Sequence, residues 1–200
     1  MLVSIIGLLV MLNPFALFLY LEPVRKDLDH KHFMRVIFKA SMISLTICFF
    51  FFFSGEFLFK KIFMIDFESF RIFGGIIIFS YAYMYIVKGQ KALIIIKENL
   101  DDLASEIALP FMVGAGTISL TIVTSYRHTR LVGILVLVAA FLINFLSIYL
   151  LKIFRDSLDR KKFKTAYDKN IEVLLRLNGF FIGAIGVNMV FVGIRNTFGI

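Results

Sequence analysis

This chain of 200 residues has few charged residues, three prolines, one cysteine and no tryptophan. Charged residues make up 18% of it and apolar residues 60%, whereas a soluble domain has about 25% charged and about 45–50% apolar residues. This imbalance excludes an ordinary soluble domain. Because Cys48 is the single cysteine, an intrachain disulfide is excluded. Cysteine usage therefore does not identify the redox compartment of the protein.

The apolar residues are gathered in long runs that contain no Lys, Arg or Asp. A helix needs roughly 20 apolar residues to cross a bilayer core of about 30 Å. The runs therefore predict an all-α polytopic membrane protein with six transmembrane helices, embedded in the lipid bilayer as a single transmembrane domain over residues 1–200. The six runs are Met1–Leu21, Ala40–Phe59, Ile72–Val87, Ile107–Tyr126, Leu131–Leu151 and Leu177–Ile194.

The net charge of +8 comes from an excess of basic residues, and most of these lie in three of the connections between the runs. The connections between runs one and two, three and four, and five and six hold 16 of the 22 Lys and Arg residues. Cytoplasmic loops carry such an excess. The sequence therefore predicts a multi-pass protein of the cell (inner or plasma) membrane with both termini outside the cytoplasm, and no nucleic-acid partner.

Two sequence features suggest an internal repeat. The segment Arg71-Ile72-Phe73-Gly74 opens the third run, and Arg176-Leu177-Asn178-Gly179 opens the sixth. Three spans is an odd number, so the second triplet of spans begins on the opposite side of the membrane from the first. We therefore expect two inverted three-helix repeats, one over about residues 1–90 and one over about residues 104–200.

Helix-disrupting residues interrupt the first and fourth runs near their middles. Backbone groups freed by such breaks are tolerated at membrane depth only where they are buried in protein or line a cavity. Paired interruptions in two halves of a chain are typical of a transporter's binding site. The candidate substrate-binding residues are Asn13, Pro14, Phe15 and Ala16 in the first run, and Pro110, Gly114, Ala115, Gly116 and Thr117 in the fourth.

Other polar residues indicate little further chemistry. Glu106 precedes Pro110 by four residues and is a candidate carrier of a coupling proton if burial raises its pKa. The three histidines, His30, His32 and His128, lie in predicted loops, and the chain has no Gly-rich phosphate loop. We therefore expect no enzymatic activity, no bound metal and no cofactor, with H⁺ or Na⁺ as the coupling ion of any transport.

Three segments together resemble the MarC family of small integral membrane proteins. They are Asn13-Pro14-Phe15-Ala16, the segment Phe70–Phe79 with its Arg71 and Gly74-Gly75, and the segment Ile107–Thr117. The chain departs from the family pattern at Ala16, which replaces a glycine, and at Ala115, which replaces a proline. The resemblance implies a transporter of small neutral amino acids such as glycine and alanine, built on inverted three-helix repeats with interrupted first and fourth spans.

Alternatives to this function stay open on the residues alone. One is an exporter of other amino acids or of an inorganic ion. Another is a non-transporting membrane scaffold, which would not need two interrupted spans. Gly179, Gly183 and Gly186 form one smooth face of the sixth run; small residues at this spacing allow close helix packing and permit a homodimer.

Overall fold

The computed structural model describes residues 1–88, 100–157 and 161–199, and all regular structure in these ranges is helical. The all-α prediction is therefore confirmed for the described part of the chain. The elements, with η denoting π-helical turns, are α1 (Leu2–Leu12), α2 (Pro14–Tyr20), α3 (Glu22–Asp27), α4 (His30–Phe57), η1 (Leu58–Phe63), α5 (Phe67–Lys88), α6 (Leu100–Glu106), η3 (Ile107–Met112), α7 (Ala115–Arg127), α8 (Arg130–Asp156) and α9 (Lys161–Phe198).

Five stretches among the described residues are long and apolar enough to cross a membrane. They are Leu2–Tyr20, His30–Gly55, Phe67–Lys88, Arg130–Asp156 and Val173–Phe198. The remaining predicted span, over 107–126, is not one helix, because it is divided into η3 and α7. Each piece alone is shorter than the roughly 20 residues that a crossing helix needs.

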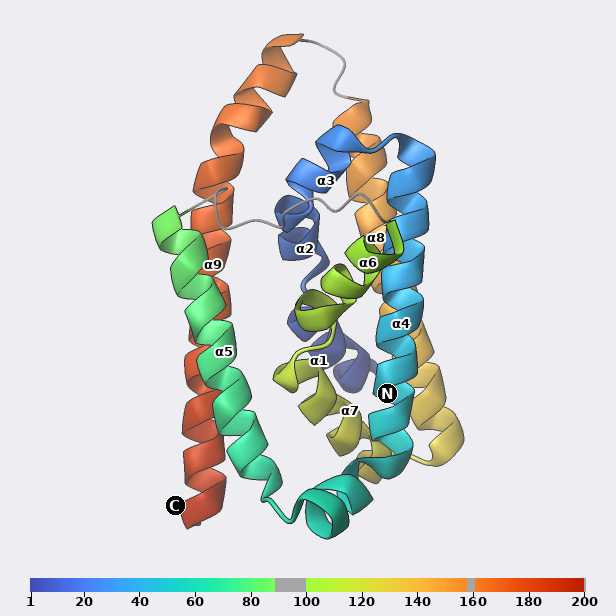
Figure 1. Ribbon diagram of the computed structural model, residues 1–200, viewed down its shortest axis with the longest axis vertical. Helices are drawn as coiled ribbons and strands as arrows, with labels where there is room; N and C mark the ends of the chain where they lie inside the picture. Colours follow the sequence, from blue (N-terminus) through green and yellow to red (C-terminus); the bar gives the residue numbers. More distant parts are fainter. Residues whose placement is uncertain (89–99, 158–160, 200) are drawn as a thin grey trace.

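The helices form three groups that lie side by side (Figure 1). α5 packs along α9 on one side, α4 packs on α8 on the other, and the short pieces α1, α2, η3 and α7 lie between them. We call the end that carries α3 the α3 end, and the opposite end, with η1 and the C-terminus, the η1 end (Figure 1). The interrupted segments therefore occupy the centre of the molecule.

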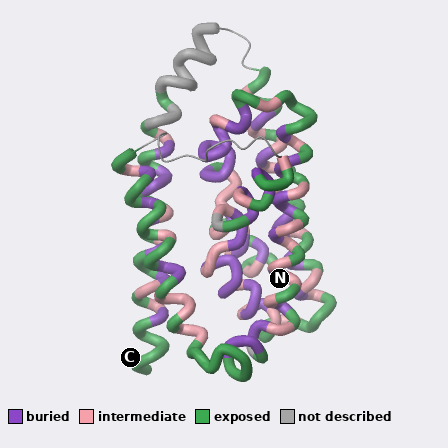
Figure 2. The backbone as a smooth tube through the Cα atoms, viewed as in Figure 1, coloured by how far each residue is buried: buried purple, intermediate pink, exposed green. Residues whose placement is uncertain are grey.

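The burial of residues differs between the central helices and the outer ones (Figure 2). The central pieces are mostly buried, whereas α5 buries only Gly74, Gly75, Ala82 and Tyr85. Large apolar side chains such as Phe50, Phe73 and Phe181 are exposed on the long outer helices. An apolar exterior of this extent suits lipid contact, since soluble proteins rarely expose large contiguous apolar patches.

The α5–α9 pair is close because glycines face each other across it. A β-carbon at Gly75 would lie 2.6 Å from the carbonyl oxygen of Gly186, and one at Gly186 would lie 2.7 Å from the carbonyl oxygen of Gly75. These backbones approach each other directly, as small residues permit in lipid. The glycine face predicted along the sixth run is thus occupied by α5 of the same chain.

The two halves of the chain pack in a reciprocal way. α4 begins at His30 and α8 at Arg130, 100 residues later, and the buried residues repeat at the same offset: Val36 with Val136, Ile37 with Leu137, Ala40 with Ala140. α1 and α2 of the first half pack on α8, and η3 and α7 of the second half pack on α4. The interruptions show the same offset, with α1 ending before Asn13 and η3 ending before Val113.

A buried ion-pair network holds α3 against α8. Arg25 pairs with Glu22 and lies 4.0 Å from Asp156, and Lys152 donates to Asp156 at 2.8 Å. The Lys152 ammonium also lies 5.5 Å from the centre of the Phe33 ring. Charges buried this deeply require such partners, so the network fixes where the chain leaves the first span.

The glycine contact predicts a position-specific effect on stability. Gly186→Ala places a methyl group against the backbone of α5 and should destabilise the protein by about 1–3 kcal/mol, the usual cost of overpacking. Gly183→Ala is the matched control on the same helix, because its β-carbon would meet only Ala82 Cβ at 3.4 Å, an ordinary contact. Thermal unfolding in detergent measures both; equal melting temperatures would contradict the close approach.

Candidate functional site

Asn13 caps the end of α1, and Pro14 begins α2. Asn13 has a left-handed backbone, with φ 42° and ψ 71°, which asparagine tolerates better than most residues. Its side-chain oxygen accepts a hydrogen bond from the Ala16 N–H at 3.1 Å and caps α2. Pro14 occupies the first position of α2, where no N–H is needed. The carbonyls of Val10, Met11 and Leu12, in the last turn of α1, are left without partners within that helix.

The second break is built from extended backbone. Leu109 has φ −119° and ψ 121°, outside the helical region that a following proline disfavours. Val113 and Gly114 are also non-helical, and α7 begins at Ala115 without a side-chain cap. The first N–H groups of α7 therefore lack acceptors within their helix. The side chain of Pro110 lies outside the described part of the structure.

A cavity of about 100 Å³ lies where the two breaks meet. Met11 in the last turn of α1 and its C-cap Asn13 line the cavity on one side. Gly114, the N-cap of α7, and Gly116 and Thr117 in its first turn line the other. A β-carbon at Gly116 would lie 2.8 Å from Met11 Sδ, so a larger residue there would crowd the wall. The negative end of one helix dipole and the positive end of another thus border the same small space.

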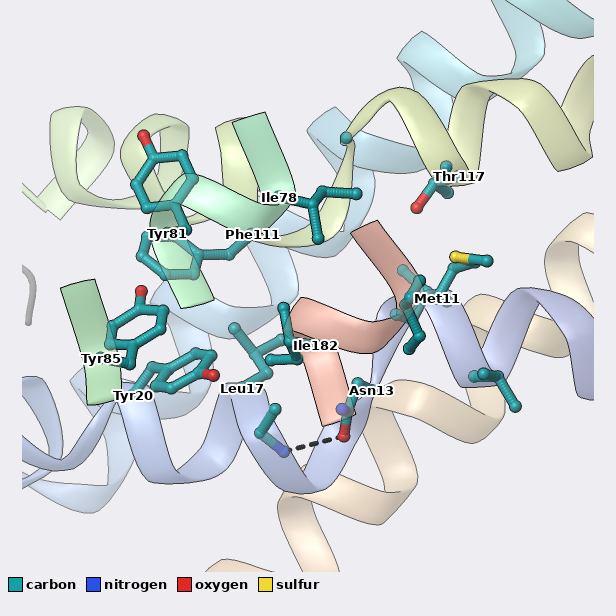
Figure 3. A pocket seen from close by; sticks show the side chains of 16 residues that line it. Met11, Asn13, Leu17, Tyr20, Ile78, Tyr81, Tyr85, Phe111, Thr117 and Ile182 are labelled. Atoms are coloured by element: carbon teal, nitrogen blue, oxygen red, sulfur yellow. Dashed lines mark hydrogen bonds between the residues drawn. The ribbon is translucent and has the colours of Figure 1, made fainter. Parts of the chain in front are cut away.

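Aromatic side chains form the wall of the cavity on the side away from Thr117 (Figure 3). Tyr20 and Tyr85 stack with ring centres 4.0 Å apart, and Phe111 lies 5.9 Å from Tyr20 and 6.3 Å from Tyr81. The Tyr85 hydroxyl is buried without a hydrogen-bond partner among the described residues. A buried hydroxyl of this kind is a ready donor or acceptor for a bound solute.

Two amides connect the first break to α9. Asn13 Nδ2 donates to Asn178 Oδ1 at 3.3 Å, and Asn178 Nδ2 donates to the Tyr20 hydroxyl at 3.3 Å. Asn178 is 7% exposed. This chain of hydrogen bonds ties both ends of α2 to the α5–α9 pair.

The cavity brings together only some of the residues predicted from the sequence. Asn13, Ala16, Gly114, Gly116 and Thr117 line it. Pro14, Phe15 and Ala115 do not: Pro14 shapes the backbone, Phe15 is 43% exposed, and Ala115 packs against Gly74 of α5.

Sequence reasoning missed the aromatic wall and Asn178. The only signal was indirect, because Tyr81 and Tyr85 lie one turn apart and so share one face of α5. Glu106 is half-buried at the end of α6 and does not line the cavity. No group of three or more metal-binding side chains occurs among the described residues.

These observations define the class of protein. A bundle of long apolar helices with lipid-suited outer faces, whose interrupted helices enclose a small cavity, is a polytopic integral membrane protein. Residues 1–198 match the MarC family of integral membrane proteins, and the chain belongs to that family. The resemblance noted in its motifs is thereby confirmed.

Curated relatives share nearly the whole chain. A UPF0056 membrane protein of Pyrococcus horikoshii is 27% identical over 191 residues, which cover 95% of this chain and 91% of the relative. A second UPF0056 membrane protein, of Aquifex aeolicus, is 25% identical over 201 residues, which cover 96% of this chain and 91% of the relative. No solved structure is significantly similar to this chain.

The cavity predicts a pattern of water access on α7. Thr117 and Thr121 are both buried, but only Thr117 lines the cavity. In a Cys48→Ala background, Thr117→Cys should react with a small methanethiosulfonate reagent, because thiol reaction needs hydrated thiolate. Thr121→Cys should react at least about tenfold more slowly; labelling of neither would mean that water does not reach the cavity.

Proposed function

We propose that this protein is a secondary transporter of small neutral amino acids of the glycine and alanine class, working by alternating access. The observation that carries the proposal is the cavity between the C-terminal end of α1 and the N-terminal end of α7. A helix N-terminus carries about half a positive charge and suits a carboxylate, and freed carbonyls suit an ammonium group. A zwitterion needs both kinds of partner at once.

Cavity size and polarity support a small substrate. An apolar cavity of about 150 Å³ accepts benzene, so a cavity of about 100 Å³ suits a smaller solute. Among the described residues of its wall there is no Lys, Arg, Asp or Glu. A net-neutral amino acid therefore fits better than a charged one, since an unpaired charge would be costly there. We assign the carboxylate to the N–H groups at Gly116 and Thr117, and the ammonium to the carbonyls of α1.

The architecture that we infer for transport is six crossings arranged as two inverted three-helix repeats. Two observations support it. α5 ends at the α3 end and α8 begins at the η1 end, so the chain between them has to traverse the bundle (Figure 1). α1 and α2 pack on α8, and the segments 100 residues later, η3 and α7, pack on α4, as a two-fold relation between halves would produce. From the positive-inside rule we take the α3 end as cytoplasmic in the plasma membrane, with both termini outside.

Uptake of labelled glycine and alanine into proteoliposomes tests the function directly. We expect accumulation driven by an imposed H⁺ or Na⁺ gradient, and a decrease of at least about tenfold in Gly114→Leu, whose side chain would fill the cavity. Phe15→Leu is the control beside the first break, since Phe15 lies outside the cavity, and it should transport like wild type. No flux under either gradient, with folded and inserted protein, would refute the proposal.

Coupling through Glu106 is a separate prediction. If this carboxyl carries the proton, Glu106→Gln should abolish accumulation driven by a proton gradient, because the amide cannot titrate. Exchange of labelled for unlabelled glycine at equal concentrations should persist, since it needs no net proton movement. Unchanged proton-driven accumulation in Glu106→Gln would remove Glu106 from the mechanism and leave the coupling group to be found elsewhere.

A further inference from the structure

A second cavity, of about 220 Å³, lies at the η1 end between α4, η1, α5 and α7. Unlike the central cavity, its wall carries charges of both signs, Arg71 and Glu68 of α5 among them. The side chain of Arg71 is 13% exposed and that of Glu68 is 22% exposed. Charges kept this far from water at the end of a membrane helix are costly and usually functional.

The guanidinium of Arg71 is bound unequally on its two sides. Nη1 donates to Glu68 Oε2 at 2.8 Å, a normal ion-pair distance. The other edge, with Nε and Nη2, faces the single neutral hydroxyl of Ser119, and both nitrogens lie 3.3 Å from its oxygen. These contacts are long for hydrogen bonds. The Nε–Nη2 edge is suited to binding a carboxylate through two parallel, charge-assisted bonds, which are shorter and stronger.

Glu68 keeps acceptor capacity for a cation. Its Oε2 binds Arg71, and its Oε1 accepts from Asn196 Nδ2 at 3.1 Å. A carboxylate has about four lone-pair positions, so these two bonds leave room for an ammonium. The neighbouring guanidinium and carboxylate thus present one site for each charged group of an α-amino acid.

The packing of α5 against α7 lies between the second cavity and the central one. Along α5, the residues of the second cavity end at Arg71 and those of the central cavity begin at Ile78. Between them Gly74 meets Ala115, where an added β-carbon would overlap the alanine methyl. On α7, Ser119 lies one turn beyond Gly116 of the central cavity. The Arg71–Ser119 contact therefore holds the two helices together where a solute would pass.

We propose that the second cavity is an entry site for zwitterionic amino acids, resting on the proposed transport function. The substrate carboxylate binds the Nε–Nη2 edge of Arg71 in place of Ser119, and its ammonium binds Glu68. Loss of the Ser119 contact removes the polar link between α5 and α7 next to the Gly74–Ala115 contact, which eases passage to the central cavity. Occupancy of the entry site is in this way linked to passage between the two cavities.

Equilibrium binding of labelled glycine to the purified full-length protein in detergent tests this proposal without relying on transport. Wild type should bind two glycines per chain, and Gly114→Leu and Arg71→Gln should each bind one. Arg71→Gln should weaken binding at the second cavity at least about tenfold, as expected when hydrogen bonds to a charged group are lost. Lys61→Gln, at an exposed cation of the same end outside the cavity, should keep both sites.

A second variant tests the entry site independently, in case Arg71→Gln does not fold. Ser119→Ala removes the competing hydroxyl and should tighten binding at the second cavity several-fold, a gain that a purely structural role for Arg71 would not produce. Ser125→Ala is its control, because the Ser125 hydroxyl bonds Ile122 O of its own helix. One glycine per wild-type chain, lost in Gly114→Leu and kept in Arg71→Gln, would overturn the entry site alone. No binding to wild type would overturn both sites.

Discussion

Backbone groups without helical partners cannot face lipid, and this constraint explains the arrangement of the molecule. Two of the predicted membrane spans are interrupted near their own middles, at residues 13–14 and at residues 113–114. Both breaks lie in the central group of short helices, between α4 and α8 on one side and the α5–α9 pair on the other (Figure 1). The cost of freed carbonyl and N–H groups is offset because they border a common cavity, where a polar solute can satisfy them.

The surrounding helices divide into parts with different packing. Glycine-to-backbone contacts hold α5 and α9 together along their length, whereas bulky apolar side chains fill the interior around α4 and α8. The hydrogen bonds of Asn178 and the stacking of Tyr20 on Tyr85 bridge the two parts across the cavity. Apolar contacts join the two parts as well, since Ala115 packs against Gly74 and Leu19 lies in one buried cluster with Leu175. The proposed alternating access would require a movement that rearranges these contacts.

Two groups of charged side chains, one at each end of the bundle, have different surroundings. At the α3 end, Arg25 pairs with Glu22 and lies 4.0 Å from Asp156, which also accepts from Lys152. At the η1 end, Arg71 offers its bidentate edge to a neutral serine beside a cavity. A network of mutually paired charges favours stability of one arrangement. An arginine with a replaceable partner favours exchange, and this difference is the physical basis for assigning substrate entry to the η1 end.

The sequence by itself determined the helical membrane class, the positions of both breaks and the distribution of basic residues, because run length, proline and asparagine backbone chemistry and charge act locally. It identified Asn13, Ala16 and Gly116 as cavity residues for the same reason. Only the tertiary structure decided that Phe15 and Ala115 point elsewhere, that Tyr85 lines the cavity, that Asn178 bonds Asn13 and Tyr20, and that Ser119 opposes Arg71. These facts depend on helix rotation and on contacts between segments distant in sequence, which long-range packing sets and local composition does not.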